Sequence, residues 1–209
     1  MTESHPSTCT AFAGARRIAS GDLRKVAVKA KAVWDHDKWA QVLIFDDLTS
    51  NLIEVDFRGT SQDVLRRITE EAANAARSSE SATPEADPLR GPGRPKLGVV
   101  AREVTLLPRH WDWLASQPGG ASVALRKLVE QARTANRGRD RRRLAQEAAY
   151  RFLSAMAGSE PGFEEAIRAL FEGKQQRFVE NVEAWPRDVR NHARKLAAVA
   201  FAEPDTPAR

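Results

Sequence analysis

A central segment of the chain, residues 99–134, carries a β-capable run and two short helical stretches that cannot bury their own apolar surface. The run at residues 99–107 leads into Pro108, and proline suits the first turn of a helix because the N–H that it lacks would have no partner there. A lone strand leaves a whole edge of N–H and C=O groups unpaired. A second copy would solve both problems, because two strands can pair across a twofold axis above four helices. The sequence therefore predicts a homodimer that is joined through this segment.

The two helical stretches each show the spacing of a single buried face. The first covers residues 109–117 and is stopped by Pro118 and the two glycines that follow it. The second covers residues 121–133, with Ser122 as its expected N-cap. Apolar residues recur every three or four positions, as in helices that bury one side. The pattern places in the core Trp111, Leu114, Leu125, Leu128 and Val129.

This order of a strand, a short helix, a glycine-containing turn and a second helix resembles the ribbon-helix-helix family of DNA-binding proteins, of the Arc and MetJ type. The resemblance implies that the paired strands enter the major groove of DNA. It also implies that Thr105 and Leu107 point into the dimer core. Ser122 and the free amides at the start of the second helix would bind a phosphate, as helix N-termini do.

The strand residues that the resemblance turns toward DNA are Arg102, Val104 and Leu106. The family usually reads bases with polar or charged side chains, whereas Val104 and Leu106 could contact only the methyl groups of thymine. With the opposite parity of the strand, Glu103 would face DNA and repel its phosphates. Both alternatives predict weak base reading, with Arg126 on the exposed side of the second helix as a further DNA contact.

Positive charge is concentrated in the same part of the chain. Residues 89–143 contain 13 basic and 4 acidic side chains, although the net charge of the whole chain is only +5. Such an asymmetry is typical of a module that binds phosphates. An arginine-rich run at residues 137–143 is a further candidate phosphate tether. The alternative is a basic surface that serves only solubility.

Directly before the strand, the four residues that start at Gly93 resemble the core of an AT-hook. In such a core, an extended Gly-Arg-Pro segment places an arginine in a narrow A·T-rich minor groove. Arg94 and Lys96 are therefore expected DNA contacts, and the alternative is a plain basic linker. The surrounding residues 77–98 are rich in proline, glycine and serine, which predicts a flexible linker that carries this arm.

Residues 8–76 are expected to form a small α+β domain. Two short runs at residues 10–14 and 17–21 could pair with each other, and Asp22 can cap the helix that follows. The remaining expected elements are a hairpin of residues 41–45 and 52–57 and a helix capped by Ser61.

Residues 139–203 are expected to form a C-terminal helical domain, because apolar residues at helical spacing are punctuated by glycine and proline. The predicted helices cover residues 144–157, 162–172, 174–185 and 186–201. The predicted fold class is α+β, with a small N-terminal α+β domain, the central ribbon-helix-helix module and this helical unit.

Catalytic constellations are not evident in the sequence, and we expect no enzyme, no cofactor and no metal. Cys9 lies near an expected loose terminus, His192 is expected on the exposed side of the last helix, and Asp46 with Asp47 suits a turn. The sequence contains no pair of histidines at metal-binding spacing and no glycine-rich phosphate loop.

The cellular compartment follows from the ends and the composition of the chain. The first residues have neither the basic nor the apolar part of a signal peptide, and a single cysteine excludes a disulfide within one chain. Charged residues make up 29% of the chain, and no apolar run is long enough to span a membrane. We therefore expect a cytoplasmic, nucleoid-associated protein.

Two hypotheses for function follow. The first is a homodimeric DNA-binding protein, a transcriptional regulator or nucleoid-associated factor. The second is an antitoxin-like adaptor, in which the ribbon only dimerises and the C-terminal helices bind a protein partner. The chain as a whole also resembles an uncharacterised bacterial family of unknown function, most clearly in residues 93–133 and 147–189, which implies a bacterial origin.

Overall fold

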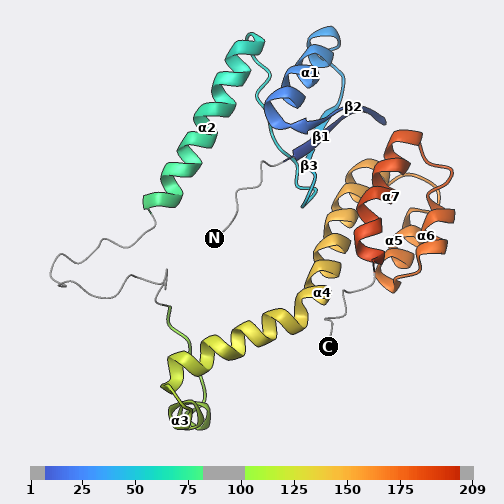
Figure 1. Ribbon diagram of the computed structural model, residues 1–209. Coiled ribbons are helices and arrows are strands. Elements are labelled where there is room, and N and C mark those ends of the chain that lie inside the picture. Colours follow the sequence, from blue (N-terminus) through green and yellow to red (C-terminus); the bar gives the residue numbers. More distant parts are fainter. Residues whose placement is uncertain (1–7, 82–101, 203–209) are drawn as a thin grey trace. The chain divides into compact units, whose positions relative to one another are not determined.

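The computed structural model of the chain describes residues 8–81 and 102–202, which form an α+β fold with a three-stranded antiparallel sheet and seven helices (Figure 1). The chain divides into two compact units. The first unit comprises Met1–Ala76 together with Gly138–Arg209, and the second comprises Arg77–Arg137. The predicted α+β class is confirmed, whereas the units differ from the predicted domains.

The sheet is built on a central strand with one neighbour on each side. β1 (Thr8–Ala13) pairs antiparallel with β2 (Arg16–Asp22) and with β3 (Val42–Asp46), so the strand order is β2-β1-β3. Gly14, between β1 and β2, has a φ of 52°, a left-handed conformation that suits glycine. The predicted pairing of the first two runs is confirmed.

One face of the sheet is covered by α1 (Leu23–His36). Asp22 caps this helix as predicted, because its Oδ1 accepts hydrogen bonds from the N–H groups of Arg24 and Lys25 at 3.0 and 3.4 Å. The helix and the sheet bury a small apolar cluster between them: Cys9, Ala11, Val26, Ala30 and Ile44.

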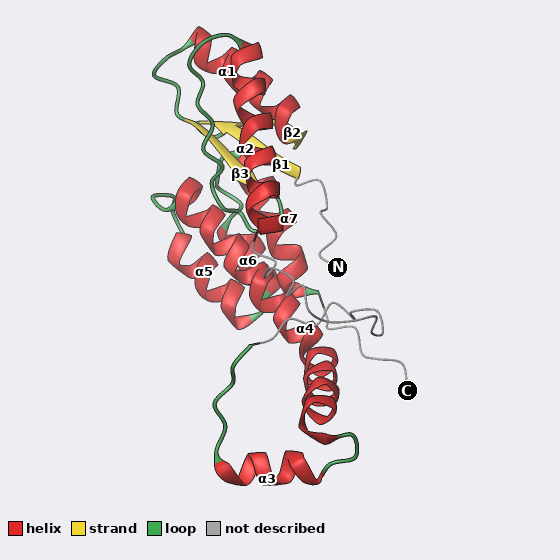
Figure 2. Ribbon diagram, turned by 90° about the vertical axis from the view of Figure 1, so that its left-hand side faces the viewer, coloured by secondary structure: helices red, strands yellow, loops and turns green. Residues whose placement is uncertain are grey.

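The opposite face of the sheet packs on the C-terminal helices. Side chains alternate between the two faces of a strand, so Phe12 points away from α1. The rings of Phe12 and Phe45 lie 5.4 and 5.2 Å from the ring of Phe152, measured between centroids. Figure 2 shows the sheet between α1 and these helices. The segments 8–76 and 139–203, predicted as separate domains, instead share one hydrophobic core, because the second apolar face of the sheet needs this cover.

The C-terminal part consists of α4 (Gly120–Ala157), α5 (Phe163–Glu172), α6 (Gln175–Asn181) and α7 (Arg187–Phe201). α5 and α7 agree with the sequence prediction, whereas α6 ends at Asn181, before the predicted end at residue 185. Gly173, with a φ of 74°, ends α5 by donating its N–H to carbonyl groups of the last turn. The indole N–H of Trp185 donates to the carbonyl oxygen of Pro161 at 2.8 Å, which satisfies a buried donor.

Residues 52–57 do not form the second strand of the predicted hairpin. Leu52 makes only an isolated bridge to Phe45, and the N–H of Ile53 donates to the carbonyl of Ile44 at 2.8 Å. β3 pairs with β1 instead. The alternating apolar side chains of this segment pack against the cluster under α1: Ile53, Val55 and Phe57.

The next helix, α2 (Ser61–Ser81), has Thr60 as its N-cap. Thr60 and Asp63 bind each other reciprocally, because Thr60 N–H donates to Asp63 Oδ2 at 2.9 Å and Asp63 N–H donates to Thr60 Oγ1 at 3.3 Å. Ser61 is therefore the first helical residue and not the cap. The helix extends through residue 81, into the stretch predicted as linker, and residues 82–98 lie outside the described part.

Candidate nucleic-acid interface

The described part of the central segment begins at Arg102 and holds α3 (Pro108–Ser116) and the first half of α4. Pro108 occupies the first turn of α3, as predicted. In the turn before α4, Gly119 has a φ of 86°, and a Cβ atom there would lie 3.2 Å from the side chain of Val123. This turn therefore requires glycine.

The first half of α4 corresponds to the predicted helix of residues 121–133, and both the start and the end of that helix differ from the prediction. It begins at Gly120, so Ser122 lies in the first turn and is not the N-cap; its carbonyl accepts a hydrogen bond from Arg126 Nε at 3.0 Å. The helix also continues without a break to Ala157. Residues 134–143 contain no proline and many arginines, which favour helices, so the single Gly138 costs about 1 kcal/mol and does not end it.

Residues 102–107 are not a strand in the single chain. Among the described residues, no backbone hydrogen bond joins residues 102–106 to another segment. The backbone of Leu107 is extended, with φ −68° and ψ 149°. A ribbon would form only if a partner strand supplied hydrogen bonds, so the predicted strand pairing stays a prediction.

Most of the predicted dimer-core side chains are uncovered in the single chain. Leu114 is buried and Leu125 is half-buried, whereas Thr105 is exposed. The exposed fractions of the large apolar side chains are 48% for Leu107, 42% for Trp111, 42% for Leu128 and 63% for Val129. Apolar surface of this kind, gathered in one segment, is typical of an interaction site.

Some of the predicted DNA contacts lie within the described residues and others lie outside them. Arg102, Val104 and Arg126 are exposed, and Leu106 is half-buried. In the single chain Leu106 is thus better covered than Leu107, the reverse of the order that the resemblance implies. Arg94 and Lys96, the residues of the predicted arm, lie outside the described residues.

The first half of α4 separates charge from apolar side chains. The basic residues Arg126, Arg133 and Arg137 follow each other at seven and four positions, which places them on one face of the helix. All three are exposed, and Arg133 Nη2 lies 3.3 Å from Glu130 Oε1. Three apolar residues of this half lie on the other side: Leu125, Leu128 and Ala132.

The second half of α4 turns a different side toward a core. The apolar stripe of the first half, continued by seven and eleven residues beyond Ala132, would fall on Arg139 and Arg143. Arg143 instead pairs with Asp140 and Glu147 at 3.5 and 3.2 Å. A new stripe then packs into the core of the first unit: Ala145, Ala149, Phe152 and Leu153.

The residues considered for catalysis have structural roles. Cys9 is not in a loose terminus but fully buried in β1, and burial, followed by the nearby aspartates, raises the pKa of its thiol to about 11. Asp46 Oδ1 accepts hydrogen bonds from the N–H groups of Leu48 and Thr49, as its predicted turn role requires. In the described ranges no group of three or more His, Cys, Asp or Glu side chains is placed to hold a metal ion.

His192 is buried, contrary to the prediction that it lies on the exposed side of the last helix. Its ring centroid lies 4.5 Å from that of Phe152 and 5.4 Å from that of Phe12. Burial, followed by the charge of Lys195, lowers the pKa of His192 to about 4. The sequence misled here because the sheet, which covers this side of α7, is distant in the chain.

One cavity was not anticipated from the sequence. It lies between α1 with β2 and the first turns of α2, and it is lined by several basic residues of the N-terminal part. The only sequence signal for it is the placement of Arg24, Lys25 and Lys29 along α1.

The comparisons with known proteins concern the whole chain. None of the helices in the described ranges combines the length and apolar character needed to cross a membrane. No curated protein and no solved structure matches the chain. A family described as an uncharacterized protein conserved in bacteria matches residues 8–197. Because this match covers most of the sequence, the chain belongs to that bacterial family, DUF2239.

Proposed function

We propose that this protein is a homodimeric DNA-binding protein, a transcriptional regulator or nucleoid-associated factor of the bacterial cytoplasm. It would contact DNA through a β-ribbon made from two copies of residues 99–107 and through the basic arm at Arg94 and Lys96. One observation carries the proposal: large apolar side chains are exposed within the segment that also holds the excess positive charge.

The dimer is supported by what the single chain leaves uncovered. Leu107, Trp111 and Val129 expose apolar surface, and residues 102–106 have no backbone hydrogen bonds to other segments of the described chain. Antiparallel pairing with the same strand of a second copy would cover the apolar surface and supply the backbone hydrogen bonds, because a twofold axis brings identical surfaces together. The finer ribbon-helix-helix assignment rests on this argument and on the order of the elements.

DNA binding is supported by the charge along α4 and before α3. Arg102, Arg126 and Arg137 are exposed, and a dimer doubles their number. Phosphate contacts of this kind position a protein on DNA without reading its sequence. Val104 and Leu106 offer base edges only apolar contacts, so we expect little sequence preference.

The direct test measures binding of a random-sequence DNA duplex by fluorescence anisotropy at several salt concentrations. If each dimer makes about four to six phosphate contacts, the affinity should fall by about a hundredfold or more between 50 and 200 mM salt. The double variant Arg94→Ala/Arg102→Ala should bind several-fold more weakly. Arg177→Ala, which removes an exposed arginine outside the central segment, is the matched control. Failure to bind in low salt would refute the proposal.

An adaptor function is the second candidate, and two observations favour it. The side chains that would face DNA include the apolar Val104 and Leu106, which suit protein contacts as well. On the C-terminal helices, the rings of Tyr150 and Phe171 lie 6.1 Å apart and are both exposed. A protein that dimerises in light scattering but does not bind DNA at low salt would support this candidate.

A further inference from the structure

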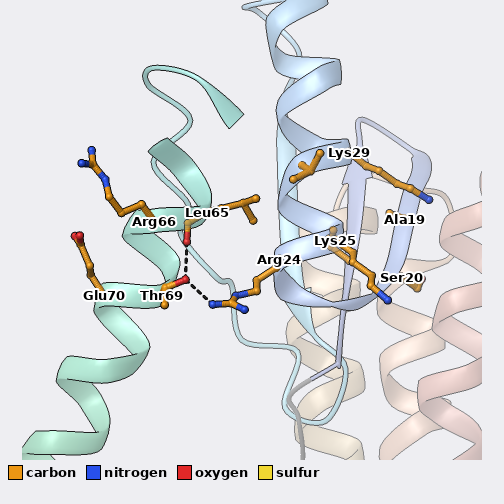
Figure 3. Close-up of a pocket in the computed structure, with 11 residues that line it drawn as sticks. Ala19, Ser20, Arg24, Lys25, Lys29, Leu65, Arg66, Thr69 and Glu70 are labelled. Atoms are coloured by element: carbon orange, nitrogen blue, oxygen red, sulfur yellow. Dashed lines mark hydrogen bonds between the residues drawn. The ribbon is translucent and has the colours of Figure 1, made fainter. Parts of the chain in front are cut away.

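A cavity of about 970 Å³ lies between α1 and β2 on one side and α2 on the other, within the first unit (Figure 3). Its size is in the upper part of the range of small-molecule sites, about 300–1,000 Å³. The apolar part of its wall comes from three elements: Ala19 of β2, Val26 and Val28 of α1, and Leu65 of α2. A cavity of this kind has the shape and the lining expected for a ligand with an apolar body.

Two sets of contacts hold the first turns of α2. Near its start, Val64 is buried and Arg67 Nη2 donates to the carbonyl oxygen of Asp56 at 2.7 Å. One turn further along, Arg24 Nη2 of α1 donates to Thr69 Oγ1 at 2.6 Å. Leu65 directly follows Val64, and its side chain lines the cavity.

The charged residues of the wall are mostly basic, with four cations and one carboxylate: Arg24, Lys25, Lys29, Arg66 and Glu70. Figure 3 shows that these groups differ in direction. Arg24 and Leu65 point into the space between the two helices, and Lys25 and Lys29 extend on the side of β2. Arg66 and Glu70 extend from α2 away from α1. Arg24 is therefore the charged group that a ligand between the helices would meet.

The guanidinium of Arg24 is held in position for such a contact. Thr69 Oγ1 accepts its hydrogen bond and itself donates to the carbonyl oxygen of Leu65 at 2.8 Å. Within the described residues, Arg24 uses one of its five side-chain N–H groups for this bond, so one edge of the guanidinium remains for a planar anion. A guanidinium matches a carboxylate with two parallel hydrogen bonds.

We propose that this cavity binds an aliphatic carboxylate, with the carboxylate on Arg24 and the hydrocarbon chain against Leu65 and Val28. A phosphate group alone gains nothing from these apolar walls. An uncharged hydrocarbon gains the walls but leaves Arg24 without a counter-charge. Only a ligand with both parts uses the whole site, which does not depend on DNA binding.

The test titrates the full-length protein with dodecanoate, below the concentration at which it forms micelles, by calorimetry. Dodecanol tests the chain without the charge, acetate tests the charge without the chain, and inorganic phosphate tests a different anion. We expect dodecanoate to bind and each of the other three to bind at least about tenfold more weakly, because each lacks one half of the interaction. Equal binding of dodecanol or of phosphate would overturn the proposal.

Variants locate the site on the chain. Arg24→Met keeps the stem of the side chain and removes the charge, and we expect it to weaken dodecanoate binding about tenfold or more. Arg66→Met removes a lining cation that points away from the space between the helices and should bind as the unchanged protein does. Amide shifts of Ser20, Leu65 and Thr69 in NMR spectra of the unchanged protein provide a readout that needs no variant. Binding without these shifts, or undiminished binding by Arg24→Met, would contradict the assignment.

Discussion

The two halves of α4 carry apolar stripes of the same spacing but differ in what covers them. In the second half, Ala149 and Phe152 are both 0% exposed, because the sheet and α5 to α7 complete their core. In the first half, Leu128 and Val129 are 42% and 63% exposed. Helical spacing thus predicts which side of a helix is apolar and not what lies against it. The first half is the surface that we assign to a second copy.

The largest expected effect is on the covered half. Phe152→Ala removes a ring that contacts Phe12, Phe45 and His192, and we expect a loss of about 3–5 kcal/mol in the free energy of unfolding. Urea unfolding followed by circular dichroism measures it. Phe171→Ala, at an exposed phenylalanine of α5, should cost less than about 1 kcal/mol. Equal losses for both variants would contradict the core described here.

Acid should weaken the same core through His192. The pKa of His192 is about 4 in the folded chain and near its ordinary value of 6.5 when unfolded, so the unfolded chain binds the extra proton between these values. The stabilisation is complete above pH 6.5 and is lost as the pH falls toward 4, by an amount on the order of 3 kcal/mol.

Asp47 opposes this shift, whereas Lys195 and Arg17 add to it. Urea midpoints measured between pH 7 and pH 4 test the prediction. In His192→Phe the part of the pH dependence due to this residue should vanish. A variant with an unchanged slope would show that other groups cause the acid sensitivity.

The uncovered half should respond in association and not in folding. We expect Val129→Asp to raise the dissociation constant of the dimer about 30-fold, because a charge in the centre of an interface costs about 2 kcal/mol or more. Sedimentation at several dilutions measures this, and the unfolding of the first unit should not change. The matched control is Val199→Asp, at an exposed valine of α7. If the unsubstituted protein is a monomer, the first half of α4 is not a dimer interface.

The smallest expected effect concerns the junction of the two halves. Gly138 lies inside α4, so Gly138→Ala should stabilise the helix by about 0.5–1 kcal/mol. Gly173→Ala, at a residue with a φ of 74°, should instead destabilise α5. Far-ultraviolet circular dichroism during urea unfolding reports both. If Gly138→Ala has no effect, the two halves do not form one continuous helix in solution.

Local signals predicted much of the fold. The glycine between β1 and β2, the cap at Asp22 and the glycine and proline stops before α5 and α7 each act within a few residues, so the sequence revealed them. The shared core of Phe12, Phe45 and Phe152 was not predictable in this way, because its members are far apart in the chain. For the same reason His192 was expected on the exposed side.

The candidate sites also differ in whether local sequence or contacts between distant residues define them. The basic face of α4 and the start of α3 at Pro108 follow from spacing and composition alone. The cavity at Arg24 depends on where α2 lies beside α1, and the hydrogen bond between these helices joins Arg24 to Thr69, 45 positions along the chain. No sequence pattern around Arg24 or Thr69 indicates that these two residues meet.

The core that joins both ends of the chain also bears on how the protein matures during synthesis. The strands leave the ribosome first, but the phenylalanine face of the sheet has to wait for helices from the far end of the chain. Between the two, the segment around α3 emerges with its own uncovered apolar side chains. Each nascent chain thus carries two adhesive surfaces until the C-terminal helices have emerged, the situation in which unfinished proteins aggregate and ribosome-bound chaperones shield them.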